Sequence, residues 1–168
     1  IEDGYGINMR PLTVFALETY GSDKCRCFAL RNPNHVTLSQ HDSALWAKMH
    51  KAISVIQFKL EGQLIQRHPE FNMDSHMMLN RINYSDMTIT IDGITYELKD
   101  KQFPTIDPLD PFALTAEEQE LMESLRFSFL HSQKLQEHIQ FMYAKGSMYL
   151  RYNNNLLYHG CIPMNEDG

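Results

Sequence analysis

The sequence predicts an α+β chain that is mostly helical and contains two β-hairpins. Apolar residues recur at three- and four-residue steps in several long segments, which is the periodicity of a buried helix face. Short runs rich in strand-forming residues flank Asp92-Gly93, and similar runs flank Asn153-Asn154. Both pairs suit two-residue hairpin turns, because these residues tolerate positive φ. With 168 residues, 43% hydrophobic and 21% charged, the chain has the composition of one globular domain or of part of a larger one.

Composition and charge exclude several classes of protein. The net charge is −6 and the sequence holds no block of lysine and arginine, so we expect no nucleic-acid partner. No apolar run approaches the roughly 18 residues that span a bilayer, and no signal peptide is visible. Three cysteines do not suggest a disulfide scaffold, and we expect a cytoplasmic protein. The start at Ile1 and the stop soon after an apolar strand pattern lead us to expect a piece of a longer protein.

A helix is predicted over residues 8–21, with Asn8 as its cap, Pro11 near its first turn and Gly21 in the left-handed position after its end. Residues 25–33 look like loop. Ser39 or Asp42 then opens the longest helix. One apolar stripe is expected to run along it, made of Leu45, Met49, Ile53, Ile56, Leu60 and Leu64.

Proline shapes the middle of the chain. His68-Pro69 ends the long helix at about Arg67, because the residue before a proline avoids helical geometry. Asp74 can cap a short helix through about Arg81. A hairpin follows near residues 87–98, turning at Asp92-Gly93. Three prolines in residues 99–114 predict an extended loop over the surface.

The last third of the chain has clear helix signals. Thr115 and Glu118 form a T-x-x-E capping box before a helix whose inner face is expected to carry Leu121, Met122, Leu125 and Phe129. Ser132 restarts a helix that ends at Gly146, with Leu135, Ile139 and Met142 expected inward. A second hairpin, over residues 147–160, turns at Asn153-Asn154.

His159 is the main candidate for chemistry, because it ends an apolar strand and is followed by Gly160. A metal ligand needs a neutral imidazole held at the end of a rigid element, and glycine lets the backbone approach a bound group closely. The same pattern also describes a histidine that merely closes a hydrophobic strand. Spacing alone leaves both interpretations open.

Other candidate sites are weaker. Cys25-x-Cys27 could be half of a thiolate site, but Cys161 is the only further cysteine and no histidine pair stands at zinc-finger spacing. His131 and His138 would share one face of a continuous helix, without an obvious third ligand.

The long helix carries positive charge that could form a phosphate-binding site, from Lys48, Lys51 and Lys59, with His50 beside them. The alternative is that these side chains form a solvated face of the helix. The glycines of EDGYGI, residues 2–7, do not form a nucleotide-binding motif. Lys51 and Arg126 are conceivable substrate contacts, but nothing in the sequence places them near His159.

Four long strings resemble the class III, Firmicutes-type fructose-1,6-bisphosphatases. They are EDGYGINMRPL, KMHKAISVIQFKLEGQLIQRHPEFNM, FPTIDPLDPFALTAEEQELMESLRFSFLHSQKLQEHIQFMYAKGSMY and YNNNLLYHGCIPMNEDG. The resemblance covers nearly the whole chain and is weakest around residues 25–41. That family is similar in its core to calcineurin-like metallophosphatases, whose ligands lie at strand ends of a β-sandwich.

The resemblance implies a role for His159. YHGCIP looks like the late H-G motif of the metallophosphatases, so His159 carries over as a metal ligand, although Cys161 stands where these enzymes often have a second glycine. The G-D-x-x-D and N-H-D motifs do not occur here, and D-x-H occurs once, at Asp74-Ser75-His76. The resemblance therefore implies a segment between metal motifs, with residues 1–146 as a mainly helical insert or cap and residues 147–168 as a strand hairpin of the metallophosphatase core.

The implied reaction is hydrolysis of fructose 1,6-bisphosphate to fructose 6-phosphate in gluconeogenesis, by two-metal catalysis with manganese. We expect the isolated segment to be inactive, because one ligand cannot hold two metal ions. A non-catalytic helical interaction module is the alternative, in which the long apolar stripe would face a partner. Substrate-binding residues, the remaining metal ligands, oligomeric state and regulation are not determined by the sequence.

Overall fold

The computed structural model describes residues 2–29 and 39–160, and the chain forms two compact units. The first unit comprises Ile1–Ile7 and Phe127–Gly168, and the second comprises Asn8–Arg126. The boundary falls within helix α4, Ala116–Leu130. The described part of the chain is α+β, with helices and two small antiparallel sheets, as the sequence predicts.

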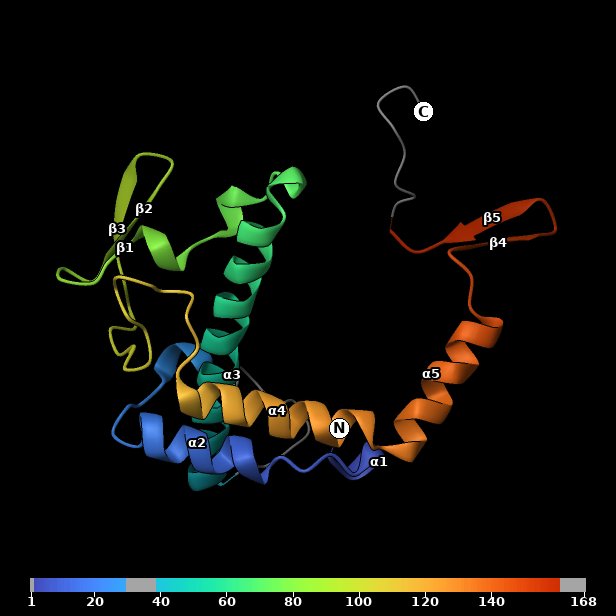
Figure 1. Ribbon diagram of the computed structural model, residues 1–168, viewed down its shortest axis with the longest axis horizontal. Coiled ribbons are helices and arrows are strands. Elements are labelled where there is room, and N and C mark those ends of the chain that lie inside the picture. Colours follow the sequence, from blue (N-terminus) through green and yellow to red (C-terminus); the bar gives the residue numbers. More distant parts are fainter. Residues whose placement is uncertain (1, 30–38, 161–168) are drawn as a thin grey trace. The chain divides into compact units, whose positions relative to one another are not determined.

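Three helices make the main core of the second unit. Figure 1 shows α2, Arg10–Tyr20, and α4 lying across the long helix α3, Gln40–Arg67. Apolar side chains from all three helices and from the loop after α2 are buried together: Leu12, Phe15, Ala16, Tyr20, Cys25, Ala47, Ala52, Ile56, Leu121 and Leu125. Burial of apolar side chains on this scale is the main favourable contribution to folding.

The two ends of α2 differ in how well the sequence predicted them. The N-cap is Met9 rather than the predicted Asn8, although the Asn8 side chain accepts a hydrogen bond from the Arg10 backbone N–H at 3.0 Å. Gly21 is not left-handed, since its φ is −54°. The Lys48 ammonium instead donates to the carbonyls of Tyr20 and Gly21, at 2.7 and 3.0 Å. These bonds satisfy the last carbonyls of α2 that a left-handed glycine would otherwise help to satisfy.

Helix α3 begins and ends where the sequence predicts. The Ser39 hydroxyl accepts a hydrogen bond from the Asp42 N–H at 3.1 Å, and the helix ends at Arg67, two residues before Pro69. Its buried face, however, is rotated from the expected stripe. Only Ile56 of that stripe is buried, while Leu64 is 44% exposed. The face that is buried carries Ala47, Lys51, Ala52, Val55, Ile56, Lys59, Gly62 and Ile65.

A second, smaller core lies in the same unit, where the proline-rich segment 99–114 packs against α3. Val55, Leu79, Ile106 and Phe112 are buried there. The expectation that this segment runs over the surface is therefore wrong for Ile106 and Phe112. The Phe112 ring lies directly over Gly62, where an added Cβ would be 2.2 Å from ring carbons. Glycine at this helix position allows the ring to approach the backbone.

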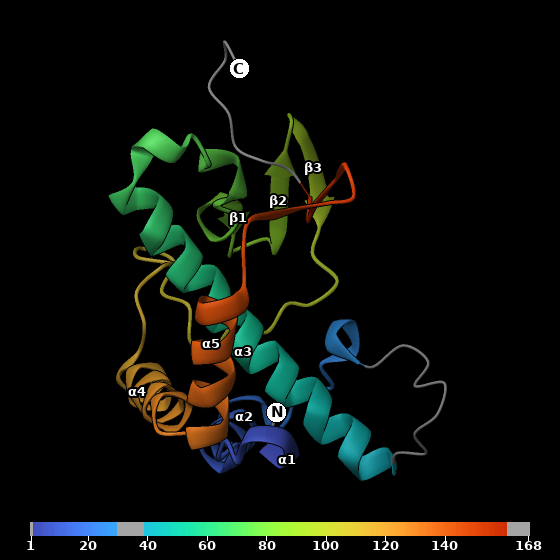
Figure 2. The same ribbon diagram turned by 90° about the vertical axis from the view of Figure 1, so that its right-hand side faces the viewer.

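A three-stranded antiparallel sheet adjoins this smaller core, beside the C-terminal part of α3 (Figure 2). Strands β2, Thr88–Ile91, and β3, Ile94–Glu97, form the predicted hairpin, with φ of +50° at Asp92 and +77° at Gly93. Strand β1, Ile82–Asn83, adds to its edge and was not predicted.

Short 3₁₀ turns replace the expected helix over residues 74–81. They cover Asp74–His76, named η3, and Leu79–Arg81, named η4, and two more occur at Arg26–Phe28 and Pro69–Phe71. A helix this short has little stability of its own, because its nucleation is costly. Packing of Leu79 into the smaller core decides the local geometry instead.

Helix α4 starts with the predicted capping box in full. The Glu118 carboxylate accepts a hydrogen bond from the Thr115 N–H at 2.9 Å, and the Thr115 hydroxyl accepts one from the Glu118 N–H at 3.2 Å. Leu121 and Leu125 are buried, Met122 is half-buried and Phe129 is exposed. The reciprocal bonds satisfy the free N–H groups of the first turn.

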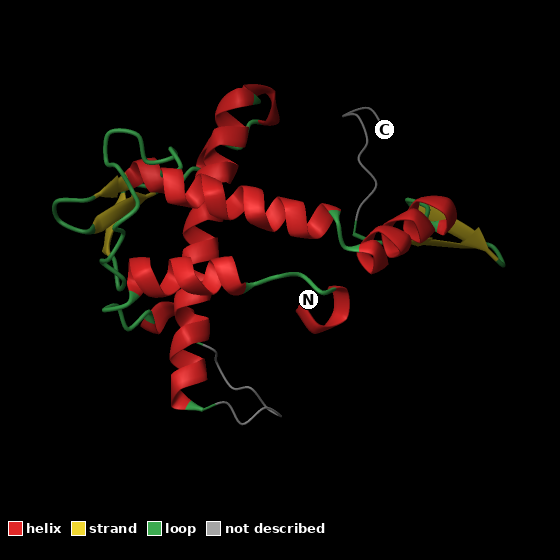
Figure 3. Cartoon of the chain, turned by 60° about the horizontal axis from the view of Figure 1, so that its bottom comes forward, coloured by secondary structure: helices red, strands yellow, loops and turns green. Residues whose placement is uncertain are grey.

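The first unit contains α1, Glu2–Tyr5, and α5, Gln133–Lys145, which leads into the hairpin of β4, Tyr149–Tyr152, and β5, Asn155–Tyr158 (Figure 3). Gly146 follows α5 and Asn153-Asn154 form the turn, with φ of +47° and +60°, as predicted. Met142 is 60% exposed rather than inward. Among the described residues, none of the helices combines the length and apolar character needed to span a bilayer.

Candidate functional site

His159 lies directly after β5, as the sequence predicts. The four residue pairs of the β4–β5 ladder, from Tyr149 with Tyr158 to Tyr152 with Asn155, hold the strand that precedes it. The histidine is exposed, and Gly160 beside it has a φ of +78°, a conformation that glycine adopts readily. An exposed imidazole at the end of a paired strand is available as a ligand. Cys161, the departure from the H-G pattern, lies outside the described residues.

The described residues do not complete a metal centre. Within 2–29 and 39–160, no three histidine, cysteine, aspartate or glutamate side chains are grouped so that they could hold an ion. His159 supplies one nitrogen donor, whereas a site with bound metal needs three or four ligands. The described part of the chain therefore offers one ligand and not a site.

The other candidate ligands are placed apart. His131 and His138 do not share a continuous helix, because α4 ends at Leu130 and α5 begins at Gln133. A ring nitrogen of His131 contacts the Phe127 carbonyl at 2.8 Å, and one of His138 contacts the Tyr5 hydroxyl at 3.1 Å. Cys25 is buried and Cys27 is exposed, so these two thiols do not face one site.

The lysines of α3 depart most from expectation, because two of them are completely buried. Lys51 is 0% exposed and its ammonium pairs with two carboxylates, Asp23 at 2.5 Å and Asp100 at 2.6 Å. The rings of Tyr20 and Phe103 lie about 5 Å from the same ammonium. A buried ammonium with two carboxylates and two aromatic faces is a structural ion pair, neither a solvated charge nor a free phosphate contact.

Lys59 repeats the pattern two turns further along α3. Its ammonium, also 0% exposed, pairs with Glu118 at 2.7 Å and donates to the Thr105 carbonyl at 2.5 Å. Glu118 thus caps α4 and neutralises a buried charge at once. A signal for both lysines was present in the sequence. They lie three or four residues from Ala47, Val55 and Gly62, so they belong to the buried face rather than to the opposite one.

Burial shifts the pKa values of the titratable groups near Lys51. Burial raises the pKa of Tyr20 to about 12, and burial together with the Asp23 charge raises the pKa of Cys25 to about 11. Burial also works to raise the pKa of Asp23, but hydrogen bonds from Lys51 and from the Cys25 N–H outweigh it and hold that pKa below its ordinary value. Tyr20 and Cys25 are therefore neutral and Asp23 is charged well beyond the neutral pH range, which suits a fixed scaffold.

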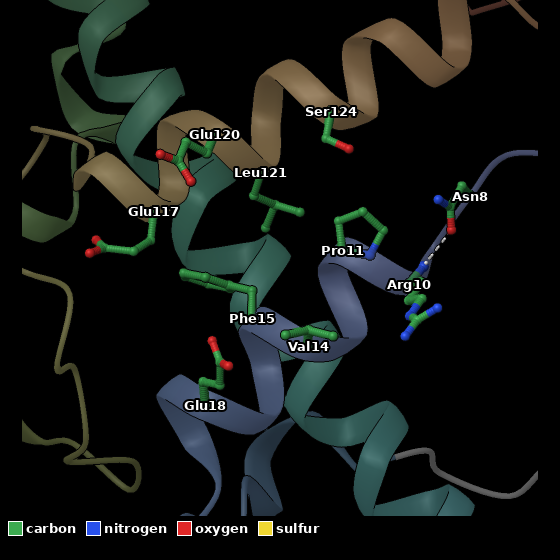
Figure 4. A pocket seen from close by; sticks show the side chains of 10 residues that line it. All are labelled: Asn8, Arg10, Pro11, Val14, Phe15, Glu18, Glu117, Glu120, Leu121 and Ser124. Carbon is green, nitrogen blue, oxygen red and sulfur yellow. Dashed lines mark hydrogen bonds between the residues drawn. The ribbon is translucent and has the colours of Figure 1, made fainter.

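A groove of about 480 Å³ lies between α2 and α4 in the second unit (Figure 4). Val14, Phe15 and Leu121 supply its apolar surface, and Glu18, Glu117 and Glu120 stand around it. Among the residues that the structure describes, neither histidine nor cysteine lines it. Its geometry suits contact with another surface more than chemistry.

Comparison with known proteins identifies the chain by sequence. The sequence model of one family, described as Firmicute fructose-1,6-bisphosphatase, matches residues 1–168. The chain is 56% identical over its whole length to fructose-1,6-bisphosphatase class 3 of Alkaliphilus metalliredigens (strain QYMF), and covers 25% of that protein. It is 58% identical over 99% of its length to the class 3 enzyme of Clostridium tetani (strain Massachusetts / E88), again covering 25%.

A third relative gives the same result from another genus. The chain is 52% identical over its whole length to the class 3 enzyme of Listeria innocua serovar 6a and covers 26% of it. No solved structure matches the chain. The chain spans about a quarter of the length of these curated relatives. Because the family's sequence model matches from the first residue to the last, the chain belongs to the Firmicute fructose-1,6-bisphosphatase family.

Proposed function

We propose that the whole protein containing this chain hydrolyses fructose 1,6-bisphosphate to fructose 6-phosphate and phosphate in the cytoplasm, as a step of gluconeogenesis. The observation that carries this proposal is the match of the family over residues 1–168, together with relatives at 50–58% identity that are all named as class 3 fructose-1,6-bisphosphatases. Identity at this level over an unbroken segment is compatible with one activity for the whole proteins.

The test of the reaction is direct. We expect the purified whole protein, supplied with manganese, to release inorganic phosphate and fructose 6-phosphate in equal amounts from fructose 1,6-bisphosphate. We expect the isolated 168-residue chain to release neither, since its described residues provide one metal ligand. Hydrolysis by the isolated chain would count against the proposal, and so would a whole protein that does not hydrolyse this substrate.

We further propose His159 as one ligand of a divalent-metal centre, with manganese as its native ion. Bound divalent ions supply an activated water and neutralise charge on the phosphoryl oxygens. This chain's part is to present one imidazole nitrogen from the end of β5. Support comes from the H-G pattern and from the exposure of His159 at the end of a paired strand. Its second ring nitrogen needs an acceptor to fix the ring.

Replacement of His159 tests this role. In the whole protein, His159→Ala should lower the rate of phosphate release by at least about a hundredfold and reduce bound manganese, because loss of a metal ligand exceeds the 10- to 100-fold cost of losing its supporting residues. His41→Ala, which removes another exposed histidine, is the matched control and should leave rate and metal content unchanged. Equal metal content in the His159 variant and the wild type would remove His159 from the centre.

We also propose that residues 147–168 belong to the β-core of the whole protein, with residues 1–146 as a helical insert beside it. In the described part of this segment, the apolar side chains on both faces of the β4–β5 hairpin are exposed. Tyr149, Leu150, Leu156, Leu157 and Tyr158 are each more than half exposed. A hairpin apolar on both faces needs cover from further strands or helices. The apolar stripe that suggested an interaction module packs mostly on the core of α2 and α4, which counts against that alternative.

A further inference from the structure

A small pocket in the second unit is lined by positive charge from two loops that are distant in the sequence. Lys24 and Arg26 come from the loop after α2, and Lys99 and Lys101 come from the loop after β3. The pocket has a volume of about 140 Å³. At ~30 Å³ for each water molecule, it has room for about four or five waters, which is the scale of one phosphate group. This clustering occurs in a chain whose net charge is −6.

Two carboxylates also line the pocket, but both are already engaged below it. Asp23 binds the Lys51 ammonium and the Cys25 N–H, at 2.5 and 2.9 Å. Asp100 binds the same ammonium at 2.6 Å and the Gln102 N–H at 3.2 Å. The Lys51 charge offsets one of these two negative charges, so the lining cations still outnumber the carboxylate charge that remains.

The same ion pairs fix the two walls of the pocket. Lys51 is completely buried and joins the loop of Asp23 to the loop of Asp100. Lys48 adds hydrogen bonds to the carbonyls of Tyr20, Gly21 and Asp23. Loops that are held before a ligand arrives lose little conformational entropy on binding, so the pocket is preorganised.

Three of the four cations at the opening are available. Lys101 pairs with Glu97 on the surface. Among the described residues, no carboxylate forms an ion pair with Lys24, Arg26 or Lys99. All three side chains are exposed. The planar guanidinium of arginine binds two phosphate oxygens at once, and lysine adds point charge from another side.

We propose that this pocket binds the phosphate group of a small phosphorylated molecule or free inorganic phosphate. A tetrahedral dianion offers oxygens to donors on both walls, whereas a carboxylate carries one charge and lies in one plane. The pocket is too small for a whole sugar bisphosphate, so it would hold one phosphate and leave the rest of the molecule outside. Phosphate binding here is independent of whether the whole protein hydrolyses a sugar bisphosphate.

The test measures binding of inorganic phosphate to the whole protein by phosphorus NMR, at low ionic strength and after metal has been removed with a chelator. Low salt matters because exposed charges are screened over about 8 Å at physiological ionic strength. Arg26→Gln/Lys99→Gln removes two pocket cations. Arg67→Gln/Lys134→Gln is the matched control, because it removes one exposed arginine and one exposed lysine that do not line the pocket.

We expect the pocket variant to weaken phosphate binding about tenfold, while the control stays within about twofold of the wild type. Binding by the pocket variant as tight as that of the wild type would overturn the proposal, as would an equal loss in the control, which would indicate a general field effect. A second arm repeats the titration with fructose 1,6-bisphosphate. A parallel loss in the pocket variant identifies a sugar-borne phosphate as the ligand, and a loss limited to inorganic phosphate identifies the free anion.

Discussion

Lys51 and Lys59 set the electrostatics of the second unit, because each is a completely buried cation with carboxylate partners. Taking such charges out of water is costly, and only well-placed partners compensate for it. Both ammonium groups have them, at 2.5 to 2.7 Å. Removing one partner of such a pair lowers the free energy of unfolding by about 3–5 kcal/mol, since the other charge stays buried without a partner. The pairs therefore fix which loops can pack on α3.

The groups around Lys51 predict how stability depends on pH. The pKa of Cys25 is raised from 9.0 to about 11 and that of Tyr20 from 10.0 to about 12, mainly by burial. Above pH 9 the folded chain therefore binds more protons than the unfolded chain. The stability that these groups contribute is complete below pH 9 and is lost as pH rises through 11 to 12. The pKa of Asp23 is lowered, so its effect has the opposite sign. The stability that Asp23 contributes is present at neutral pH and is lost only as the solution becomes acidic.

Unfolding by urea at a series of pH values, followed by circular dichroism, measures this dependence. Cys25→Ser should flatten the alkaline fall in the free energy of unfolding, because a serine hydroxyl does not titrate in this range. Cys27→Ser changes an exposed thiol and should keep the wild-type slope. Identical alkaline slopes in all three proteins would show that the buried thiol does not titrate as described.

At the scale of the element, α3 owes its packing to Gly62. Alanine at a glycine position within a helix normally stabilises it by about 1 kcal/mol. Here the added Cβ would meet Phe112 ring carbons at 2.2 Å. We expect Gly62→Ala to lower the free energy of unfolding by about 1–3 kcal/mol, because the ring is in the smaller core and must move. In urea unfolding, Gly62→Ala/Phe112→Leu should recover part of the loss, and a stabilised single variant would contradict the contact.

Variants of the α4 capping box can separate two contributions to stability, the local cap and the long-range Glu118–Lys59 ion pair. Thr115→Ala should cost about 1 kcal/mol, which is typical for an N-cap. Glu118→Ala should cost more, about 3–5 kcal/mol, since it also leaves the Lys59 ammonium buried without its carboxylate. The double variant Glu118→Ala/Lys59→Met should regain part of that difference. Equal losses for the two single variants in urea unfolding would mean that the buried pair contributes nothing beyond the cap.

These elements also show which features a sequence reveals. The Asp92-Gly93 turn, the Ser39 cap and the Thr115–Glu118 box were predicted because each acts within four residues. Lys51 and Lys59 were mistaken for surface or phosphate-binding charges, because their carboxylate partners are 28, 49 and 59 positions away. The buried face predicted for α3 was wrong for the same reason.

The role of His159 remains a prediction. Its position after β5 follows from local pattern, but the described residues contain no group of three side chains that could hold a metal ion. Spacing within this chain could not have identified it. The resemblance of YHGCIP to a metallophosphatase motif is what separates a ligand from a histidine that closes a strand.

At the scale of the whole molecule, the two hairpins differ in surroundings. β2–β3 joins β1 and adjoins the smaller core of the second unit, whereas every residue of β4 and β5 is exposed. A two-stranded hairpin by itself is marginally stable in water. The chain spans about a quarter of the length of its curated relatives, and we propose that further segments of the whole protein cover β4–β5.

Hydrogen exchange with mass spectrometry tests this difference. Amides of β4–β5 should exchange rapidly in the isolated 168-residue chain and at least about a hundredfold more slowly in the whole protein, where further packing would hold them closed. Amides of β2–β3 serve as the internal control and should exchange alike in both proteins. Equally fast exchange of β4–β5 in both proteins would show that this hairpin is not part of a larger core.

The long sequence separation within the buried ion pairs has a consequence for synthesis on the ribosome. Lys59 leaves the exit tunnel well before Glu118, which lies 59 positions later in the chain. Until that glutamate emerges, α3 carries a cation on the face that must become buried. The nascent second unit therefore cannot complete its packing one helix at a time. Its final closure must wait until α4 has been translated, so folding of this segment follows synthesis of α4.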